Sequence, residues 1–378
     1  LLAGAFAPAH LLAQDVAQAA PEIGIKYTDK AGWASKKFMV SAANPLAVEA
    51  GYTILKQGGS AIDAAIATQL VLTLVEPQSS GIGGGAFLMH YDGKNVQAFD
   101  GRETAPARAT EKLFQNADGT PVSRVEGVVG GRSVGAPGVL RMLEMAHKQH
   151  GKLPWKALFA PAIALADEGF PVSARLNGML LWDKHVRTDP VALAYFFDPS
   201  GKPWPVGHVL KNPELALTLR TIAAGGADAF YKGGIANDIA AKVASHPRNP
   251  GLLSALDIAG YQAKVRTPVC NDYRAFTVCG MPPPSSGGIA VAQMLGILET
   301  KDMRALAPKD GKVGADAVHL FSEAGRLAYA DRNRYAADTD FIPLPGRGIP
   351  SLLDKTYLAK RAALIGQNSM GVAKAGTP

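Results

Sequence analysis

Cysteine is scarce in this 378-residue sequence, and long hydrophobic runs are missing. Only Cys270 and Cys279 are present, and metal binding would need further ligands close to them. The eight histidines give one close pair, His147 and His150, whose position before Gly151 suits a helix end better than zinc. Charges or prolines interrupt each apolar segment before it reaches the roughly 18 residues that a membrane span requires. We therefore expect neither a metal site nor a membrane span.

A run of charge of one sign is also missing. The 39 lysines and arginines are interspersed with 32 acidic residues, so the formal net charge of +7 is spread along the chain. Without a basic run, the composition does not predict nucleic-acid binding, and it favours small anionic substrates only in a general way. A hydrophobic content of 47% is ample for a large core, and we find no internal repeat.

One common catalytic motif is absent, and one cofactor-binding pattern is present in the wrong structural context. No GxSxG sequence occurs, and Ser285-Ser286 has no histidine nearby in the sequence. Residues 81–86 fit the pattern GxGxxA, which in dinucleotide-binding folds follows a strand and opens a helix. Here residues 60–75 predict a helix and residues 86–91 predict a strand, so the order is reversed. We expect no nucleotide and no other cofactor.

The most informative stretch is residues 79–106, where a glycine-rich loop is followed by a strand, a tight turn and a second strand. The turn residues Asp92-Gly93 are a strong signal for a β-hairpin. The glycines of the loop allow a ligand or another backbone to approach closely. The hairpin would hold Arg102 just beyond its second strand, which suits an anion site. The alternative is a structural ion pair of Arg102 with Asp100 or Glu103.

Helix caps and turn residues predict the remaining architecture. Asn44-Pro45 and Asn212-Pro213 each supply a cap and a first turn, and Ser60 with Asp63 predicts a capping box. The predicted hairpins are few and lie near both ends of the chain, so the predicted class is α+β. We expect helices over 45–57, 60–76, 138–150, 155–168, 212–225, 230–245, 288–299, 316–334 and 352–364 (the last capped by Ser351 with Asp354), and strands over 86–91, 96–99, 265–270 and 275–279.

Three separated motifs carry a family resemblance. The chain resembles the gamma-glutamyltransferases at GIGGGAF (residues 81–87), DGRETAP (residues 100–106) and MPPPSSGG (residues 281–288), and the resemblance extends over nearly the whole sequence. It implies a four-layer αββα sandwich of the N-terminal-nucleophile hydrolase type. Residues 21–378 would be the large subunit of a single domain that a separate small subunit completes. The precursor of such an enzyme cuts itself into the two subunits.

The same resemblance implies a reaction with no catalytic residue in this chain. A small-molecule substrate such as glutathione would pass its gamma-glutamyl group to the amino-terminal threonine of the small subunit, and then to an amino acid, a peptide or water. Thr377 is followed by Pro378 and does not fit that role, so we expect the sequence to stop at or before the processing junction. Arg102 matches the family's arginine that holds the α-carboxylate of the glutamyl group.

Other functions stay open on the sequence alone. A sister enzyme of the same fold, either a beta-lactam (cephalosporin) acylase or a poly-gamma-glutamate transpeptidase, would share much of the motif pattern. Turnover of glutathione analogues would distinguish it from the favoured function. A non-enzymatic periplasmic binding protein is the third hypothesis, and it would not split into two chains.

The amino-terminal segment predicts export. Residues 1–13 are apolar, and Ala17-Gln18-Ala19 fits a small-residue cleavage site, so residues 1–20 are expected to be a signal-peptide remnant and N-terminal segment. A periplasmic or secreted location follows. In that compartment Cys270 and Cys279, which flank a predicted turn, favour a disulfide over two free buried thiols.

Overall fold

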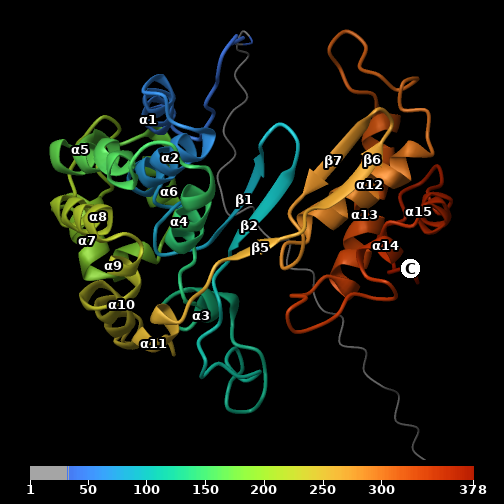
Figure 1. The fold of residues 1–378 in the computed structure, drawn as a ribbon. Helices are drawn as coiled ribbons and strands as arrows, with labels where there is room; N and C mark the ends of the chain where they lie inside the picture. The colour runs from blue at the N-terminus through green and yellow to red at the C-terminus, as the bar shows by residue number, and fades with distance from the viewer. Residues whose placement is uncertain (1–31, 33) are drawn as a thin grey trace, which may run out of the picture.

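The computed structural model describes residue 32 and residues 34–378, so the predicted signal-peptide remnant lies outside the described part. A central sheet of three short strands separates two groups of elements (Figure 1). We call the larger group the helical region: α1 (Pro45–Lys56), α2 (Ala61–Val75), α4 (Val139–His150), η1 (Trp155–Phe159), α5 (Ala160–Glu168), α6 (Ala174–Trp182), η2 (Val186–Thr188), α7 (Pro190–Phe196), α8 (Pro213–Gly225), α9 (Asp228–Tyr231), α10 (Gly234–Ala244) and α11 (Ala255–Ala259), with the small ladder of β3 (Phe170–Pro171) and β4 (Val209–Leu210).

The smaller group, here called the C-terminal unit, begins at residue 269. It contains the hairpin of β6 (Val269–Tyr273) and β7 (Phe276–Gly280), followed by α12 (Gly287–Glu299), α13 (Ala315–Tyr335), α14 (Ile349–Leu352) and α15 (Lys355–Ala362). A short helix, α3 (Arg124–Val128), lies in the long loop between the central sheet and α4 (Figure 1). Helices and strands follow no regular alternation, so the predicted α+β class is confirmed at this level.

The central sheet contains the predicted hairpin. β1 (Ala86–Tyr91) and β2 (Val96–Gly101) pair antiparallel, and β5 (Lys264–Arg266) pairs antiparallel with the other edge of β2. In the turn, the Asp92 carboxylate accepts hydrogen bonds from the amides of Lys94 and Asn95 at 2.8 and 2.7 Å, and Gly93 has a φ of 97°. β2 is therefore the middle strand, and it ends directly before Arg102.

Three of the predicted caps lie where the sequence placed them. The Asn44 side chain accepts from the Leu46 amide of α1, and Ser60 with Asp63 forms a reciprocal capping box at α2. The Asn212 side chain accepts from the Leu215 amide at 2.9 Å and so caps α8. α2 is apolar around most of its circumference because it lies inside the helical region, in contact with α1, α4 and α5. Within the described part, no helix combines the length and apolarity that crossing a membrane requires.

Two predicted helices are wrong as continuous elements. The helix over 230–245 is interrupted at Lys232-Gly233, where Gly233 adopts a φ of 75°, and α9 and α10 are separate helices. The helix over 352–364 is interrupted after Leu352. Its cap is Asp354, whose carboxylate accepts from the Tyr357 amide at 2.9 Å, and not Ser351, which lies inside α14.

The predicted strand over 265–270 is also wrong as one element. Thr267-Pro268 separates β5 from β6, and the two strands belong to different sheets. Proline has no amide hydrogen for a ladder, so it is a natural point of division. The hairpin turn is shorter than the predicted turn over residues 271–274 and lies at Arg274-Ala275, where Arg274 has a φ of 55°.

Candidate functional site

Arg102 leaves β2 with its backbone fixed on both sides. Its amide donates to Asp100 Oδ1 at 2.9 Å, and its carbonyl accepts from the Tyr261 hydroxyl at 2.7 Å. Asp100 is buried, and its other carboxylate oxygen accepts from Arg266 Nε at 2.7 Å. Burial raises the pKa of Tyr261 well above its ordinary value, so its hydroxyl stays protonated as a donor. The hairpin therefore positions Arg102, while the side chain itself is exposed.

The Arg102 guanidinium has no ion pair and no hydrogen bond with any other described residue. Asp100, one alternative partner from the sequence, is paired with Arg266 instead. Glu103, the other, lies against the glycine-rich loop, where a Cβ on Gly85 would overlap its carboxylate. The structural ion-pair interpretation therefore has no contact to support it, and the guanidinium is available to an anion from outside the chain.

A cavity of about 470 Å³ lies beside Arg102. Small-molecule sites commonly have volumes of roughly 300–1,000 Å³, so this one has room for a peptide-sized ligand. Its walls come from segments that are far apart in the sequence. The lining residues are Gly83, Arg102, Glu103, Thr104, Ala105, Pro106, Leu113, Phe114, Arg132, Ser133, Val134 and Gly135.

Backbone contacts hold the two main walls together. Thr104 and Ala136 form an antiparallel bridge in which the Ala136 amide donates to the Thr104 carbonyl at 2.9 Å. The Gly84 carbonyl accepts from the amides of Gly138 and Val139, at 2.9 and 3.1 Å, and so caps the start of α4. The prediction that another backbone passes close to the glycine-rich loop is thereby confirmed.

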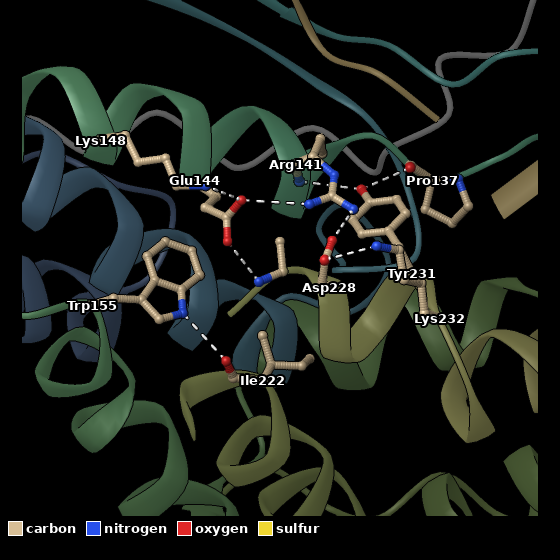
Figure 2. A network of polar contacts seen from close by, with 10 residues as sticks. Pro137, Arg141, Glu144, Lys148, Trp155, Ile222, Asp228, Tyr231 and Lys232 are labelled. Atoms are coloured by element: carbon tan, nitrogen blue, oxygen red, sulfur yellow. Dashed lines mark hydrogen bonds and ion pairs between the residues drawn. The ribbon is translucent and has the colours of Figure 1, made fainter. Parts of the chain in front are cut away.

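The cavity wall formed by residues 132–135 continues to Pro137, which contacts the buried Tyr231 (Figure 2). The Tyr231 hydroxyl donates to the Pro137 carbonyl at 2.8 Å and accepts from the Arg141 amide at 3.2 Å. The Arg141 guanidinium lies 4.4 Å from the centroid of the Tyr231 ring and pairs with Asp228 at 2.8 Å and Glu144 at 3.4 Å. These contacts join α4 to α9, so the loop that enters α4 keeps its place in the cavity wall.

The cavity contains a group for binding an anion but no nucleophile with a base beside it. No histidine of the described part lines it: His90 and His150 stack on each other, and His147 contacts the Leu153 carbonyl at 2.9 Å. The Ser133 hydroxyl, in the cavity wall, donates to a backbone carbonyl 3.1 Å away. Among residues 32 and 34–378, no group of three acidic, histidine or cysteine side chains could hold a metal ion.

Cys270 and Cys279 do not line this cavity and lie in the C-terminal unit. They are directly opposite each other in the β6–β7 hairpin, with their Cα atoms 4.0 Å apart, and a disulfide joins them. Hairpin register therefore brings the two thiols together. Their oxidation in protein recovered from cells stays a prediction.

Arg132 is a second basic residue in the cavity wall, and the sequence analysis did not single it out. It follows Gly130-Gly131, as Arg102 follows Gly101, so a glycine directly before a loop arginine is the signal the two share. That signal is weak, because glycines precede many loop residues without any role in binding.

Known proteins are similar in sequence to this chain. The family described as Gamma-glutamyltranspeptidase matches residues 47–376. The glutathione hydrolase proenzyme of Bacillus subtilis (strain 168) is 38% identical over 346 residues, which cover 91% of this chain and 57% of the relative. The acylase ACY 1 proenzyme of Pseudomonas sp. (strain SE83) is 38% identical over 335 residues, or 86% of this chain and 58% of the relative. The chain thus spans little more than half the length of these curated relatives.

The fold is shared as well. The crystal structure of Helicobacter pylori gamma-glutamyltranspeptidase matches with a TM-score of 0.83 at 32% sequence identity, over 91% of this chain and 97% of that chain. The family match covers most of the sequence and includes the DGRETAP motif that carries Arg102. The resemblance that the three motifs indicated is therefore confirmed, and this chain belongs to the gamma-glutamyltranspeptidase family.

Proposed function

We propose that this chain is the larger part of an enzyme that transfers the gamma-glutamyl group of glutathione, or of a related gamma-glutamyl amide, to an amino acid, a peptide or water. One observation carries the proposal. The Arg102 guanidinium lines a peptide-sized cavity and has no acidic partner in the described part of the chain. A free carboxylate of a small ligand is the group that such a site would bind.

In this proposal Arg102 holds the α-carboxylate of the glutamyl group. A guanidinium presents two parallel N–H groups to a planar carboxylate, a geometry that a lysine ammonium lacks. The contacts of Asp100 and Tyr261 with the Arg102 backbone are present before any ligand binds. The backbone then needs no ordering on binding, and only the Arg102 side-chain rotamers remain to be fixed.

The transfer itself would use a threonine at the amino end of a second chain. Its hydroxyl oxygen attacks the γ-carbonyl carbon while its own amine takes the hydroxyl proton. The donor C–N bond then breaks, the departing amine takes up that proton, and a threonine ester remains. Water or an amino acid then attacks the ester, the ester C–O bond breaks, and a proton of the attacking molecule passes to the threonine oxygen. No side chain of the described cavity has to act as nucleophile in this scheme.

The lengths of the relatives support a second chain cut from the same precursor. This chain spans little more than half of the curated proenzymes but corresponds to almost all of the Helicobacter pylori chain. These proportions are expected if a precursor is cut and its larger piece has been compared. We propose a heterodimer in which the small subunit completes a four-layer αββα sandwich.

Uncovered apolar side chains on the C-terminal unit support the same assembly. Val318, Phe321 and Tyr329 of α13 are each more than half exposed, and Phe341, in the loop that follows, is 83% exposed. β1 is an edge strand of the central sheet, and the β6–β7 hairpin has only two strands. Open strand edges beside apolar surface are usually covered in a stable protein. The small subunit is the partner we propose for them.

The proposed location is the periplasm or the outside of the cell, where the Cys270–Cys279 disulfide would form. A second candidate function is amide hydrolysis by a beta-lactam acylase, favoured by the 38% identity shared with the Pseudomonas acylase. A poly-gamma-glutamate transpeptidase is a further variant of the same fold. Because Arg102 would recognise an α-carboxylate, relative turnover of gamma-glutamyl-p-nitroanilide and a cephalosporin amide separates the first two.

The full-length precursor, expressed with its export signal, tests the proposal. We expect intact-mass analysis to show two chains, and the purified protein to release p-nitroaniline from gamma-glutamyl-p-nitroanilide. Arg108→Gln is a matched control, because Arg108 follows the same motif and donates to the Leu252 carbonyl but does not line the cavity. It should be cut and active like the wild type. A single uncut chain without turnover would contradict the proposal.

A further inference from the structure

Arg132 is a half-buried cation whose charge has no partner in the described structure. Its Nε donates to Asn249 Oδ1 at 2.7 Å and its Nη1 to the Leu113 carbonyl at 3.3 Å, and both acceptors are neutral. No carboxylate of residues 32 and 34–378 forms an ion pair with it. Its Nη2 has no acceptor within the same part of the chain. One edge of the guanidinium is therefore held by the protein, and the other is available.

The surroundings hold Arg132 rigidly. Asn249 is only 6% exposed, and its amide nitrogen donates to the carbonyls of Glu126 and Val129 at 2.5 and 2.7 Å. Gly130 has a φ of 112°, and a Cβ there would crowd Asn249. The loop before Arg132 is therefore tightly packed on the segment that contains Asn249, and the guanidinium is ordered before a ligand binds.

Arg132 and Arg102 line the same cavity. Leu113, the acceptor for Arg132 Nη1, also lines it, whereas Asn249, the acceptor for Nε, lines a second cavity that Arg132 borders as well. The only carboxylate in the lining is that of Glu103, which packs on the glycine-rich loop and pairs with neither arginine. Two arginines without an ion pair in the lining of one cavity favour a ligand with two anionic groups, because a half-buried charge is stabilised by an opposite charge nearby.

We propose that Arg132 binds a second carboxylate of the substrate, on the amine side of the amide bond that is broken. The cavity would then select gamma-glutamyl donors whose leaving group is an amino acid or peptide with a free carboxylate. Transfer to an amino acid reverses the bond breaking of the donor, so the same contact would also hold the carboxylate of an incoming amino acid. This inference rests on the proposed function, because it assigns Arg102 to the α-carboxylate.

Two donors that differ by one group give the direct test. Gamma-glutamylglycine ends in a carboxylate, and gamma-glutamylglycinamide ends in a neutral amide of almost the same shape. A charge-assisted contact to a partly exposed guanidinium should make kcat/KM for the two-chain wild-type enzyme about tenfold higher with the carboxylate donor, mainly through a lower KM. A ratio of one in the wild type would overturn the inference, whatever the variants show.

Variants assign the preference to a residue. Arg132→Gln should bring the ratio of the two donors close to one, and Arg132→Lys should keep part of the preference because it keeps the charge. Arg102→Gln should lower kcat/KM for both donors and leave their ratio unchanged. Arg108→Gln should change neither quantity, because Arg108 does not line the cavity.

A merely structural Arg132 would give a different pattern. Its loss would then disturb the cavity wall and lower kcat/KM equally for both donors. A ratio that stays at the wild-type value in both Arg132 variants would therefore overturn the inference. If the wild type turned over neither donor and also failed with gamma-glutamyl-p-nitroanilide, the proposed function would fail, and this inference with it. Turnover without discrimination is a separate result, which contradicts only the role of Arg132.

Discussion

The helical region and the C-terminal unit are stabilised in different ways. One apolar cluster runs through the helical region and includes fully buried side chains such as Leu70 and Phe159. The C-terminal unit has two much smaller clusters, and buried polar side chains such as Glu323 and Asp331 lie beside them. The helical region thus has a continuous core, whereas the C-terminal unit combines small cores with buried polar contacts.

The polar contacts of the C-terminal unit hold the last residues of the chain. Asp331 Oδ1 accepts from the Gly376 amide at 2.8 Å and pairs with Arg361 at 3.2 Å, and its Oδ2 accepts from the Tyr357 hydroxyl at 2.6 Å. Glu323 accepts from the Met370 amide at 2.9 Å. Burial and the contact with Asp331 raise the pKa of Tyr357, so that hydroxyl remains a donor. This difference fits the proposed assembly, in which the small subunit would cover the C-terminal unit.

The largest expected effect comes from withholding that partner. This chain expressed alone should be poorly soluble or unfolded, beginning in the C-terminal unit, because its exposed apolar surface has no cover. Co-expression with the small subunit should rescue it. Hydrogen exchange followed by mass spectrometry should then show amides of α13 exchanging faster than those of α2 in the isolated chain, and both exchanging slowly in the heterodimer. If the isolated chain were monomeric, unfolded cooperatively and had amides equally protected from exchange in both regions, the proposed difference in stability between them would be wrong.

The next largest effect is expected at Asp331. Asp331→Asn keeps the shape but leaves the buried Arg361 without its counter-charge, so it should lower the free energy of unfolding by about 3–5 kcal/mol. Asp238→Asn is a control, since Asp238 is an exposed residue of α10 without a polar contact in the described part. Its effect should stay within about 0.5 kcal/mol. Urea denaturation of the heterodimer measures the free energy of unfolding of both variants. Equal effects would show that the contacts of Asp331 do not stabilise the fold more than an exposed carboxylate does.

A smaller effect is expected from the hairpin disulfide. The double variant Cys270→Ser, Cys279→Ser should lose about 2–3 kcal/mol, because the bridge closes a short loop in the unfolded chain. Exchange in the helical region should be unaffected, since the bridge lies in the C-terminal unit. Thiol labelling of denatured periplasmic protein is the companion measurement. Two labelled thiols without reductant would refute the disulfide.

The smallest effect concerns an ion-pair network between the central sheet and the C-terminal unit. Arg266 of β5 pairs with Asp100 in the central sheet and with Asp340 in the loop after α13, each at 2.7 Å. Hydrogen bonds from Arg266 and Lys264 hold the pKa of Asp340 well below its ordinary value. A depressed carboxyl pKa stabilises the fold above the unfolded pKa of about 3.9, and this contribution is lost as the pH falls through the folded pKa.

Asp340→Asn should therefore lower the urea midpoint at about pH 6, and the gap to the wild type should narrow at about pH 3. Because Asp340 is 31% exposed, solvent screening limits the expected effect to about 1 kcal/mol or less. A gap that widens on acidification would have the wrong sign for this network.

Local signals in the sequence predict much of the fold, and long-range contacts explain what they miss. The caps Asn44, Ser60 and Asn212 and the Asp92-Gly93 turn depend on neighbours within a few residues, so pattern is sufficient. The breaks at Gly233 and Pro268 were missed although each position carries a local signal, a glycine pair and a proline. Periodicity alone continues through both positions.

One part of the candidate site could likewise be predicted from the sequence, and the other part could not. Arg102 was predictable, because a hairpin ends directly before it and a family motif contains it. The opposite wall was not, since Leu113 and Arg132 reach the cavity only through the Thr104–Ala136 bridge and the packing of Asn249. Contacts between residues so far apart in the sequence leave no local pattern.

The central claim is that Arg102 holds the substrate carboxylate, and steady-state kinetics of the matured Arg102→Gln enzyme tests it most directly. Loss of a charge-assisted contact of about 1.5–3 kcal/mol predicts a fall in kcat/KM of roughly ten- to a hundredfold, with Arg102→Lys between this variant and the wild type. Self-cleavage of the precursor should survive in both variants, because it needs no free glutamyl carboxylate. Abolished maturation together with an unchanged KM in any residual enzyme would show instead that Arg102 has a structural role.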